Sequence, residues 1–434
     1  MQPKTADAIA ARIREDIGRG ALRSGDALPS IRDLAASVKV NRNTAASAYT
    51  KLVQAGLIES RGRGMRVAIR PFSETQEAKV DDDLINLADG NPDPLFLPSP
   101  QSGAMNALSG KPVLYGAEPD EPELVAEFQR LARLDGLPFE GVMVMPGTTE
   151  SIGRVLTEYV QAGDHVIVED PCYMKVLYLL RSIGVVPIPV PMERDGMNVE
   201  VLAQKITRRT KVIILTPRAQ NPTSISYSKR RMEDIRQVLH AHPQLMVVED
   251  EHLGPLSLRP YHSAISSDRE HWAIFRSTAK YLGPDYRIAA MLASQKTTQR
   301  MKARRVASGH WVSHILQKLA LAVWREPQTG GLITQARLAY EERRKRFMAV
   351  LAEGGVAALG DDGLFVWLKT DHCERVAARL YRAGWSTRTG ADFCIKAPSG
   401  LRITTASLTP QLSDELAALV CEQFSHNRPL RTGS

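Results

Sequence analysis

Cysteine is scarce in this chain of 434 residues. Its four cysteines, Cys172, Cys373, Cys394 and Cys421, lie far apart in the sequence. That spacing supports neither a disulfide framework nor a zinc site, and it favours reduced thiols. The chain also lacks an apolar run near the ~20 residues that span a bilayer, and its first residues lack the apolar core of a signal peptide. We therefore expect a cytoplasmic protein that is not bound to a membrane.

Most of the chain has no excess of positive or negative charge. Residues 1–70 hold 13 Lys and Arg against 6 Asp and Glu, whereas the other 364 residues hold 43 against 42. A compact basic module attracts polyanions such as DNA, while a neutral body needs no such partner. An ordinary solvated surface would account equally well for the charge alone, so the placement of the residues has to decide.

Three short helices are predicted in the basic module. Apolar residues recur at every fourth position from Ile9 to Ile17, which places them on one face of a helix over residues 5–19. Ser30 can cap a second helix, and Asn41 can cap a third. Two helices joined by a tight turn, the second with small polar residues off its apolar face, are typical of a helix-turn-helix.

A glycine-rich hairpin is predicted next. The letters "RGRG" at residues 61–64 lie between strand-like segments and predict a wing that lies on phosphate or in a minor groove. An ordinary surface role is the common alternative for any arginine. Four arginines around one reading head, Arg32, Arg42, Arg61 and Arg63, favour DNA binding.

These motifs resemble the winged-helix domain of GntR-family transcription regulators over about residues 5–69. The similarity lies in "SGDALPSIRDL", in the Arg-Asn-Thr turn and in the Gly-x-Gly wing. It implies that some arginines contact DNA near base edges and that the wing follows the backbone, since guanidinium forks read guanine and other cations add affinity without sequence. The residues so implied are Arg32, Arg42, Asn43, Thr44, Arg61, Arg63 and Gly64.

A different pattern follows the basic module. Residues 71–84 are polar and acidic, so we expect a linker. From residue 85 on, seven short apolar runs alternate with amphipathic stretches, which predicts an α/β body with a mostly parallel sheet covered on both faces. We expect this body over residues 85–427, with a smaller α/β subdomain over about 330–427 and a tail over 428–434.

Five of the apolar runs are followed by residues suited to one cofactor. Gly147, Thr148 and Thr149 open a helical stretch and offer free amides to a phosphate. The other four runs are followed by Tyr173, Asn221, Asp250 and Lys280, and such residues gather at the carboxyl ends of strands. A lysine that forms a Schiff base and a carboxylate that keeps a ring nitrogen protonated suit a phosphorylated pyridine aldehyde. A lone lysine or aspartate is usually a surface or capping residue, but all five together favour a cofactor site.

The body resembles the fold-type I pyridoxal-phosphate enzymes of the aspartate aminotransferase group over about residues 85–425. The resemblance implies that Lys280 carries pyridoxal 5'-phosphate (PLP) and that Ser277 and Arg287 bind its phosphate. Asn221 is similar to the residue that bonds the ring hydroxyl, and Asp250 to the partner of the ring nitrogen.

Other positions carry the same resemblance. Tyr173 is similar to the stacking aromatic, and Tyr115 is placed like the tyrosine that reaches the phosphate of the neighbouring subunit, which implies a homodimer. Arg402 resembles the arginine that holds a substrate carboxylate, with a structural ion pair as the alternative. His252 stands where a tyrosine is usual, so an imidazole would bond the ring hydroxyl. Three positions depart from usual glycines: Cys172, Ser224 and Glu121.

A winged helix followed by an aminotransferase-like body resembles the MocR subfamily of GntR-type regulators. The resemblance implies a PLP-responsive transcription regulator, with repression of a vitamin B6 salvage or metabolism gene as the expected role. Double-stranded DNA and a second copy of the chain are the expected partners, and PLP or an amino-acid-like second ligand is the expected signal. An active aminotransferase that carries a DNA-binding module is the alternative, although the departures lead us to expect no more than slow half-transamination.

Overall fold

A computed structural model describes residues 5–18, 22, 26–54, 58–61, 64–67, 84–106, 108, 112–308 and 311–425. Its contacts divide the chain into two compact units. One consists of Met1–Asp82 with the short segments Gln161–Gly163 and Leu180–Val186, and the other of the remaining residues. Below, residues 5–67 are called the N-terminal unit and residues 84–425 the body.

The N-terminal unit has the predicted helices and hairpin. Its elements are α1 (Ala6–Gly18), α2 (Ile31–Ser37), α3 (Arg42–Gln54), β1 (Ile58–Arg61) and β2 (Gly64–Val67), with the two strands antiparallel. The Ser30 hydroxyl accepts a hydrogen bond from the amide of Asp33 at 3.2 Å, and the Asn41 side chain accepts one from the amide of Thr44 at 2.7 Å. Both predicted caps are therefore confirmed. The side chain of Ile17 lies outside the described part of the chain.

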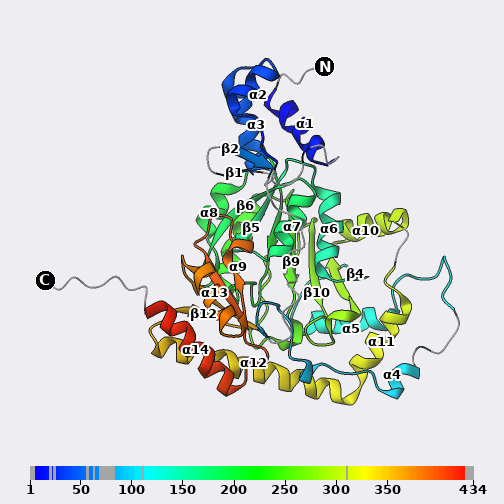
Figure 1. Ribbon diagram of the computed structural model, residues 1–434. Coiled ribbons are helices and arrows are strands. Elements are labelled where there is room, and N and C mark those ends of the chain that lie inside the picture. The colour runs from blue at the N-terminus through cyan, green and yellow to red at the C-terminus, as the bar shows by residue number, and fades with distance from the viewer. Residues whose placement is uncertain are drawn as a thin grey trace. The chain divides into compact units, whose positions relative to one another are not determined.

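The body is built on an eight-stranded sheet with the order β4-β11-β10-β9-β8-β5-β6-β7 (Figure 1). Its strands are β4 (Gly141–Met145), β5 (His165–Asp170), β6 (Val186–Glu193), β7 (Gly196–Met197), β8 (Thr210–Leu215), β9 (Met246–Glu251), β10 (Trp272–Ser277) and β11 (Ala289–Ala293). The central pairs β5–β8, β8–β9 and β9–β10 are parallel, whereas β11 runs antiparallel to both neighbours. Each of the seven apolar runs forms a strand, and the central strands β5, β8, β9 and β10 are parallel as predicted, within a mixed sheet.

Helices accompany this sheet along the chain. They are α4 (Ser102–Asn106), α5 (Pro122–Leu134), α6 (Thr148–Tyr159), α7 (Met174–Ser182), α8 (Val199–Lys205), α9 (Lys229–His240), α10 (Gln295–Ser308) and α11 (His314–Arg325). Short 3-10 turns lie at η1 (Pro94–Phe96), η2 (Gly254–Leu256) and η3 (Pro284–Tyr286). Helix α6 packs on the middle of the sheet, against β8, β9, β10 and β11. It begins at Thr148, within the predicted Gly-Thr-Thr turn and directly after Gly147, so the helix starts where the sequence predicts it.

A second, smaller sheet lies near the C-terminal end of the body. It has the order β12-β13-β16-β15 and consists of β12 (Ala358–Leu359), β13 (Phe365–Lys369), β15 (Arg388–Thr389) and β16 (Gly400–Thr404). Strand β3 (Ile85–Asn86) pairs with β14 (Trp385–Ser386) in a separate parallel ribbon. The remaining elements are α12 (Pro327–Glu353), α13 (Cys373–Arg382), η4 (Gly390–Asp392) and α14 (Pro410–Ser425). Helices α12 and α14 pack side by side (Figure 1).

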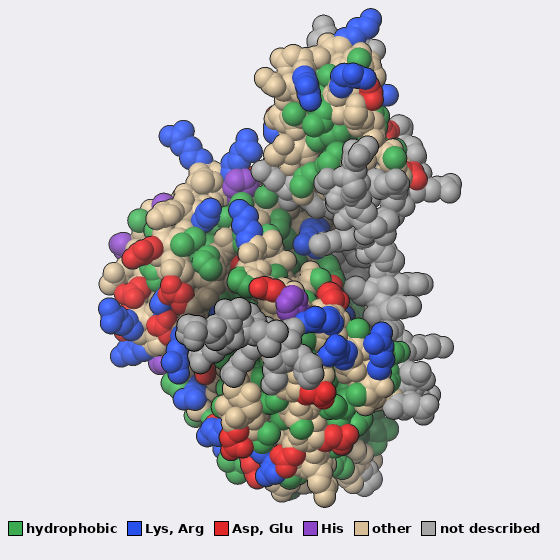
Figure 2. Space-filling model, turned by 60° about the vertical axis from the view of Figure 1, so that its left-hand side comes forward, with side chains coloured by type: hydrophobic (Ala, Val, Ile, Leu, Met, Phe, Trp, Pro, Cys, Tyr) green, Lys and Arg blue, Asp and Glu red, His purple; other side chains and the backbone are tan. Residues whose placement is uncertain are grey.

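The surface of the body carries no dominant charge. Figure 2 shows Lys and Arg side chains interspersed with Asp and Glu over its visible face. Within the described ranges, no helix is both long and apolar enough to cross a membrane. The same ranges contain no group of three or more His, Cys, Asp or Glu that could hold a metal ion.

Candidate functional site

The N-terminus of α6 forms one end of the candidate site. Gly147 caps this helix with a φ of 82°, and a Cβ placed there would lie 2.6 Å from Nη2 of Arg287. The guanidinium of Arg287 therefore lies against the helix N-terminus, where it donates a long hydrogen bond of 3.4 Å to the carbonyl of Pro146. The amides of Thr148 and Thr149, the helix dipole and this cation together favour an anion such as a phosphate.

Lys280 lies just past the end of β10. Ser277, the last residue of that strand, is buried, and its hydroxyl accepts a hydrogen bond from the amide of Ala279 at 3.2 Å. The Lys280 ammonium donates to the carbonyl of Gly90. Burial, and secondly the charge of Arg402, lower the pKa of Lys280 to about 8. A lysine with a lowered pKa supplies the neutral amine that attacks a carbonyl carbon.

Asp250 offers a buried carboxylate oxygen without a partner. It lies in β9, and its Oδ1 has no hydrogen-bond partner among the described residues. Burial, and then the charge of Glu251, raise the pKa of Asp250 to about 7. An unpaired buried carboxylate oxygen is costly unless a donor reaches it. A protonated pyridine nitrogen is such a donor, so the residues present fit PLP.

Arg402 and Asn221 form a pair. Nη1 of Arg402 donates to Oδ1 of Asn221 at 3.0 Å, and Nη2 donates to the carbonyl of Ala88. The rings of Phe365 and Phe393 lie 4.6 and 5.2 Å from the guanidinium carbon. None of the ion pairs among the described residues involves Arg402, and its Nε is buried without a partner. The structural ion pair considered from the sequence is not found, so the guanidinium can receive a carboxylate.

Tyr173 and His252 are the aromatic residues of the candidate site. Tyr173 packs in an apolar cluster with Trp367 and Phe393, and burial raises the pKa of its hydroxyl to about 12. His252 has Nε2 at 2.8 Å from the carbonyl of Ala219, which assigns the ring proton to Nε2. Burial lowers the pKa of His252 to about 4, so the imidazole is neutral. Its unprotonated Nδ1 can then accept a hydrogen bond from a hydroxyl group.

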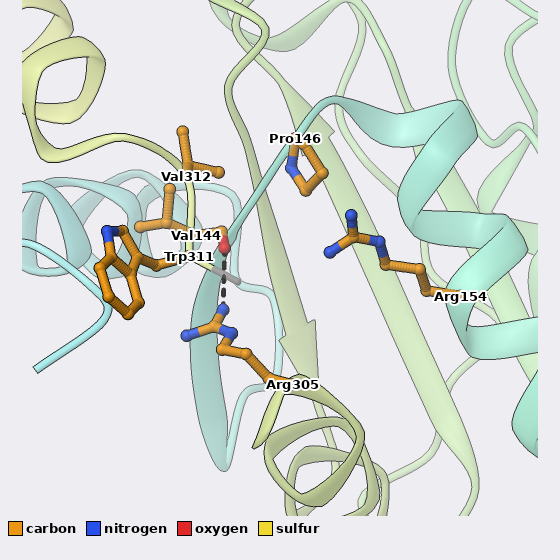
Figure 3. A pocket seen from close by; sticks show the side chains of 6 residues that line it. All are labelled: Val144, Pro146, Arg154, Arg305, Trp311 and Val312. Carbon is orange, nitrogen blue, oxygen red and sulfur yellow. Dashed lines mark hydrogen bonds between the residues drawn. The ribbon is translucent and has the colours of Figure 1, made fainter. Parts of the chain in front are cut away.

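Tyr115 is not brought to this site within one chain. Its side chain is 92% exposed, and its ring lies 5.7 Å from that of Trp311. Trp311 also lines a small pocket, shown in Figure 3 with Val144, Pro146, Arg154, Arg305 and Val312. Both cations of this pocket are paired, because Arg305 bonds Asp120 at 2.9 Å and Arg154 bonds Glu150 at 3.1 Å. The pocket shares no residue with the predicted cofactor site.

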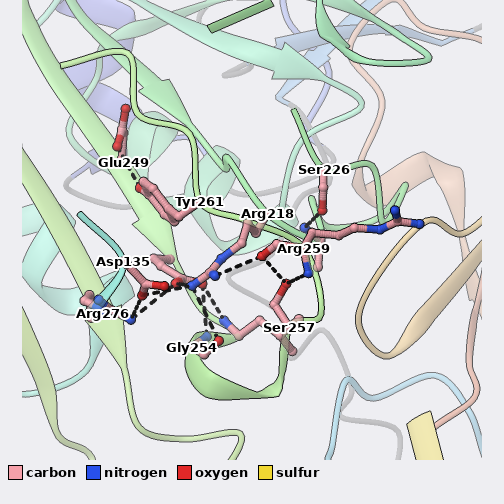
Figure 4. A network of polar contacts seen from close by, with 12 residues as sticks. Asp135, Arg218, Ser226, Glu249, Gly254, Ser257, Arg259, Tyr261 and Arg276 are labelled. Atoms are coloured by element: carbon pink, nitrogen blue, oxygen red, sulfur yellow. Dashed lines mark hydrogen bonds and ion pairs between the residues drawn. The ribbon is translucent and has the colours of Figure 1, made fainter. Parts of the chain in front are cut away.

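A buried charge network lies next to Asp250 and was not predicted from the sequence (Figure 4). Arg218 bonds Glu251, and Arg276 bonds Asp135 at 2.5 Å. Although burial favours the neutral acid, the two arginines hold the pKa of Glu251 at about 2. The network fixes the end of β9, where Asp250 lies. The sequence offered only one hint of this network, which is that Arg218 and Glu251 each directly follow an apolar run.

The predicted DNA-contacting residues that the structure describes lie at the surface of the N-terminal unit. Arg32, Arg42, Asn43 and Gly64 are exposed. Thr44 is half-buried, and its hydroxyl donates to Asn41 at 2.9 Å, so this residue also serves the helix cap. Arg61 ends β1, but its side chain and the whole of Arg63 lie outside the described residues.

Comparison with known proteins places both parts of the chain. The model for aminotransferase class I and II matches residues 82–420, and the model for bacterial regulatory proteins of the gntR family matches residues 5–67. The structure is similar to kynurenine aminotransferase from Pyrococcus horikoshii in complex with PMP, with a TM-score of 0.73 and 20% identity over 86% of this chain and 96% of that chain. The body is an aminotransferase class I and II domain of fold type I, and this family uses PLP.

Some relatives are similar to this chain over most of its length, so that the match includes both parts. The chain is 39% identical, over 96% of its length and 97% of the relative, to the vitamin B6 salvage pathway transcriptional repressor PtsJ of Salmonella typhimurium. It is 26% identical, over 78% of its length and 75% of the relative, to the probable rhizopine catabolism regulatory protein MocR of Rhizobium meliloti. The chain belongs to the MocR group of GntR-family transcription regulators. The family and the fold class predicted from the sequence are confirmed.

Proposed function

We propose that the protein is a PLP-responsive repressor of a vitamin B6 salvage gene that acts on DNA in the cytoplasm. One observation carries the cofactor half of the proposal: Asp250, whose Oδ1 has no partner among the described residues, lies in β9 directly beside β10, the strand that leads to Lys280. Helix α6 packs on both strands, and its N-terminus suits a phosphate. The GntR-type N-terminal unit supports the DNA half. The similarity to PtsJ supports vitamin B6 salvage as the regulated process.

Each side chain has a separate role in this proposal. PLP supplies an aldehyde and an electron-withdrawing ring when it is bound. Lys280 attaches the aldehyde covalently, and Asp250 holds a proton on the ring nitrogen. The other proposed contacts are Ser277, Arg287 and the amides of Thr148 and Thr149 at the phosphate, Asn221 and His252 at the ring hydroxyl, and Tyr173 on the ring face. The amide of Gly147 was expected to be free, but it donates to the carbonyl of Met145 at 2.9 Å.

A titration tests the proposal. The affinity of the purified protein for DNA upstream of its own gene is measured by fluorescence anisotropy with increasing PLP at fixed salt, because phosphate contacts make the affinity salt-dependent. A tenfold change in affinity would correspond to about 1.4 kcal/mol of coupling between the two sites. Tight DNA binding that PLP leaves unchanged would exclude PLP as the signal.

An active aminotransferase is the second candidate. It is favoured by the Arg402 guanidinium, which donates to Asn221 and Ala88 but makes no ion pair among the described residues, so that a substrate carboxylate would fit there. Under the main proposal, the same guanidinium would hold an amino-acid-like second ligand. A panel of amino acids distinguishes the two. Repeated conversion of bound PLP to its amine form would support the enzyme, whereas binding without turnover would support a ligand of the regulator.

We further propose that the body forms a homodimer through the surface around Tyr115. Leu95, Leu114 and Ile315 expose 79%, 73% and 62% of their side chains, and exposed apolar groups of this kind mark protein interfaces. We expect Leu114→Asp to yield a monomer with a lower affinity for PLP, as measured by light scattering and by absorbance. Tyr381→Asp, at another exposed apolar position, is the control. A dimeric Leu114→Asp variant would contradict the proposed interface.

Arg42 should carry part of the DNA specificity. It is exposed at the first turn of α3, and a bidentate arginine–guanine contact contributes about 1–3 kcal/mol. We therefore expect Arg42→Ala to weaken specific DNA binding about tenfold and to leave binding to unrelated DNA nearly unchanged. Arg12→Ala removes the same charge from α1 and is the control. If Arg42→Ala and Arg12→Ala lost the same DNA affinity, Arg42 would contribute only its charge and no sequence specificity.

A further inference from the structure

Three consecutive backbone carbonyls are held by side chains, two of which belong to the candidate site. The carbonyls of residues 88–90 accept hydrogen bonds, in order, from Arg402, Thr404 and Lys280. The bond from the Thr404 hydroxyl is 2.6 Å long. The two outer donors are the cations that the proposed function assigns to a carboxylate and to PLP, whereas the middle donor has no such role.

This segment passes directly against Lys280. A Cβ built on Gly90 would lie 3.7 Å from the Lys280 nitrogen and 3.0 Å from Cζ of Phe365, so there is little room for a side chain. An additional ion pair joins Arg388 to Asp89 at 3.5 Å. The segment therefore contacts Lys280, Arg402 and Arg388.

The same segment is anchored on the side of the predicted linker. The amide of Ile85 donates to the carbonyl of Gly384 at 2.9 Å, and that of Leu87 donates to Ser386 at 2.8 Å. Residue 84, the last residue of the predicted linker, is the only one of its residues that the structure describes. Three residues, 85–87, separate it from the first of the three carbonyls. We call residues 85–90 the strap.

We propose that the strap reports the occupancy of Lys280 to the linker. The proposal rests on the proposed function, in which Lys280 attaches PLP. In that step, the neutral Lys280 amine loses two hydrogens, which leave as water with the aldehyde oxygen, and its nitrogen becomes bonded to the aldehyde carbon. The amine that donates to residue 90 is thereby consumed. A carboxylate on Arg402 would compete with the first carbonyl in the same way, while the bond from Thr404 remains.

Attachment of PLP and the bond from Lys280 to the strap exclude each other. A ligand shifts a conformational equilibrium only by its differential interaction with the two states. Here Lys280 either donates to the strap or holds PLP, so the two arrangements cannot share that nitrogen. Because the strap continues into the predicted linker, the free energy of PLP attachment acts on the chain that leads to the N-terminal unit.

Hydrogen–deuterium exchange of the full-length protein tests the strap directly. We expect PLP to increase exchange in the peptide over residues 84–94, because loss of the bond from Lys280 to Gly90 removes one of the three side-chain anchors of this segment. Exchange in that peptide that is unchanged or slower when PLP is bound would overturn the proposal. This readout needs neither DNA nor turnover.

A matched pair of variants tests the link to DNA. Thr404→Val removes the middle donor, whereas Thr405→Val removes a hydroxyl that donates to Leu364 at 3.3 Å, and both threonines are buried. We expect both variants to keep the absorbance of bound PLP. The PLP-induced change in DNA affinity should shrink about fivefold in Thr404→Val, which corresponds to one hydrogen bond, and stay at the wild-type size in Thr405→Val.

The outcomes separate the two proposals. A wild-type protein whose DNA affinity ignores PLP would overturn the proposed function. A wild-type protein that responds to PLP, together with equal responses in Thr404→Val and Thr405→Val, would overturn the role of the strap alone.

Discussion

Lys280→Ala abolishes the visible absorbance of bound PLP and every effect of PLP on DNA affinity. This is the largest effect that we expect, because Lys280 is the proposed point of covalent attachment and the alanine side chain has no amine that could replace it. The measurements are an absorbance spectrum after dialysis against PLP-free buffer and the anisotropy titration. PLP that still shifts the DNA affinity of this variant would show that covalent attachment is not the switch.

The same variant also probes the strap. Since Lys280→Ala removes the donor to Gly90, the ligand-free variant resembles the PLP-bound protein in this one respect. We expect its DNA affinity without PLP to move from the ligand-free wild-type value toward the PLP-bound value. Lys302→Ala, which removes an exposed lysine of α10, controls for the loss of one charge and should behave as wild type.

Local patterns in the sequence were sufficient for most of the fold. Each apolar run of the body formed a strand because a buried parallel strand needs apolar side chains on both faces. Gly147 marked the start of α6 because the backbone there has a positive φ, which glycine adopts without strain. The glycine expected at position 224 is explained in the same way, since Ser224 has a φ of 57°.

Contacts between distant segments could not be predicted in this way. The bond from Arg276 to Asp135 joins residues 141 positions apart, and the bond from Lys280 to Gly90 joins residues 190 positions apart. Neither periodicity nor turn chemistry encodes such pairs, because both describe neighbours along the chain. The strap was part of an unremarkable stretch of sequence, and its importance comes only from the side chains that reach it in three dimensions.

Asp250→Asn should weaken PLP binding and stabilise the ligand-free protein at the same time. The amide cannot provide the negative charge for a protonated ring nitrogen, and a charge-assisted hydrogen bond contributes about 1.5–3 kcal/mol, so we expect the affinity for PLP to fall about 10- to 100-fold. Absorbance titration measures this loss. An unchanged affinity would exclude Asp250 as the partner of the ring nitrogen.

The gain in stability follows from the sign of the pKa shift. Burial raises the pKa of Asp250 from 3.8 to about 7. The folded state therefore keeps this proton after the unfolded state has lost it, and stability falls as the pH rises from about 4 to about 7. Asparagine carries no such charge, so Asp250→Asn gains up to about 4 kcal/mol in the free energy of unfolding at pH 8 and little at pH 4.

Glu249→Gln provides the matched control. Burial raises the pKa of Glu249 to about 7 as well, but its carboxylate already accepts hydrogen bonds from Tyr261 at 2.7 Å and from the amide of Ala264 at 2.7 Å. We expect this variant to change the pH dependence of stability without lowering the affinity for PLP. Denaturation at pH 4, 6 and 8 without PLP compares both variants with the wild type. If Asp250→Asn gained nothing at pH 8, its carboxylate would not be the strained, cofactor-ready group that its unpartnered oxygen indicates.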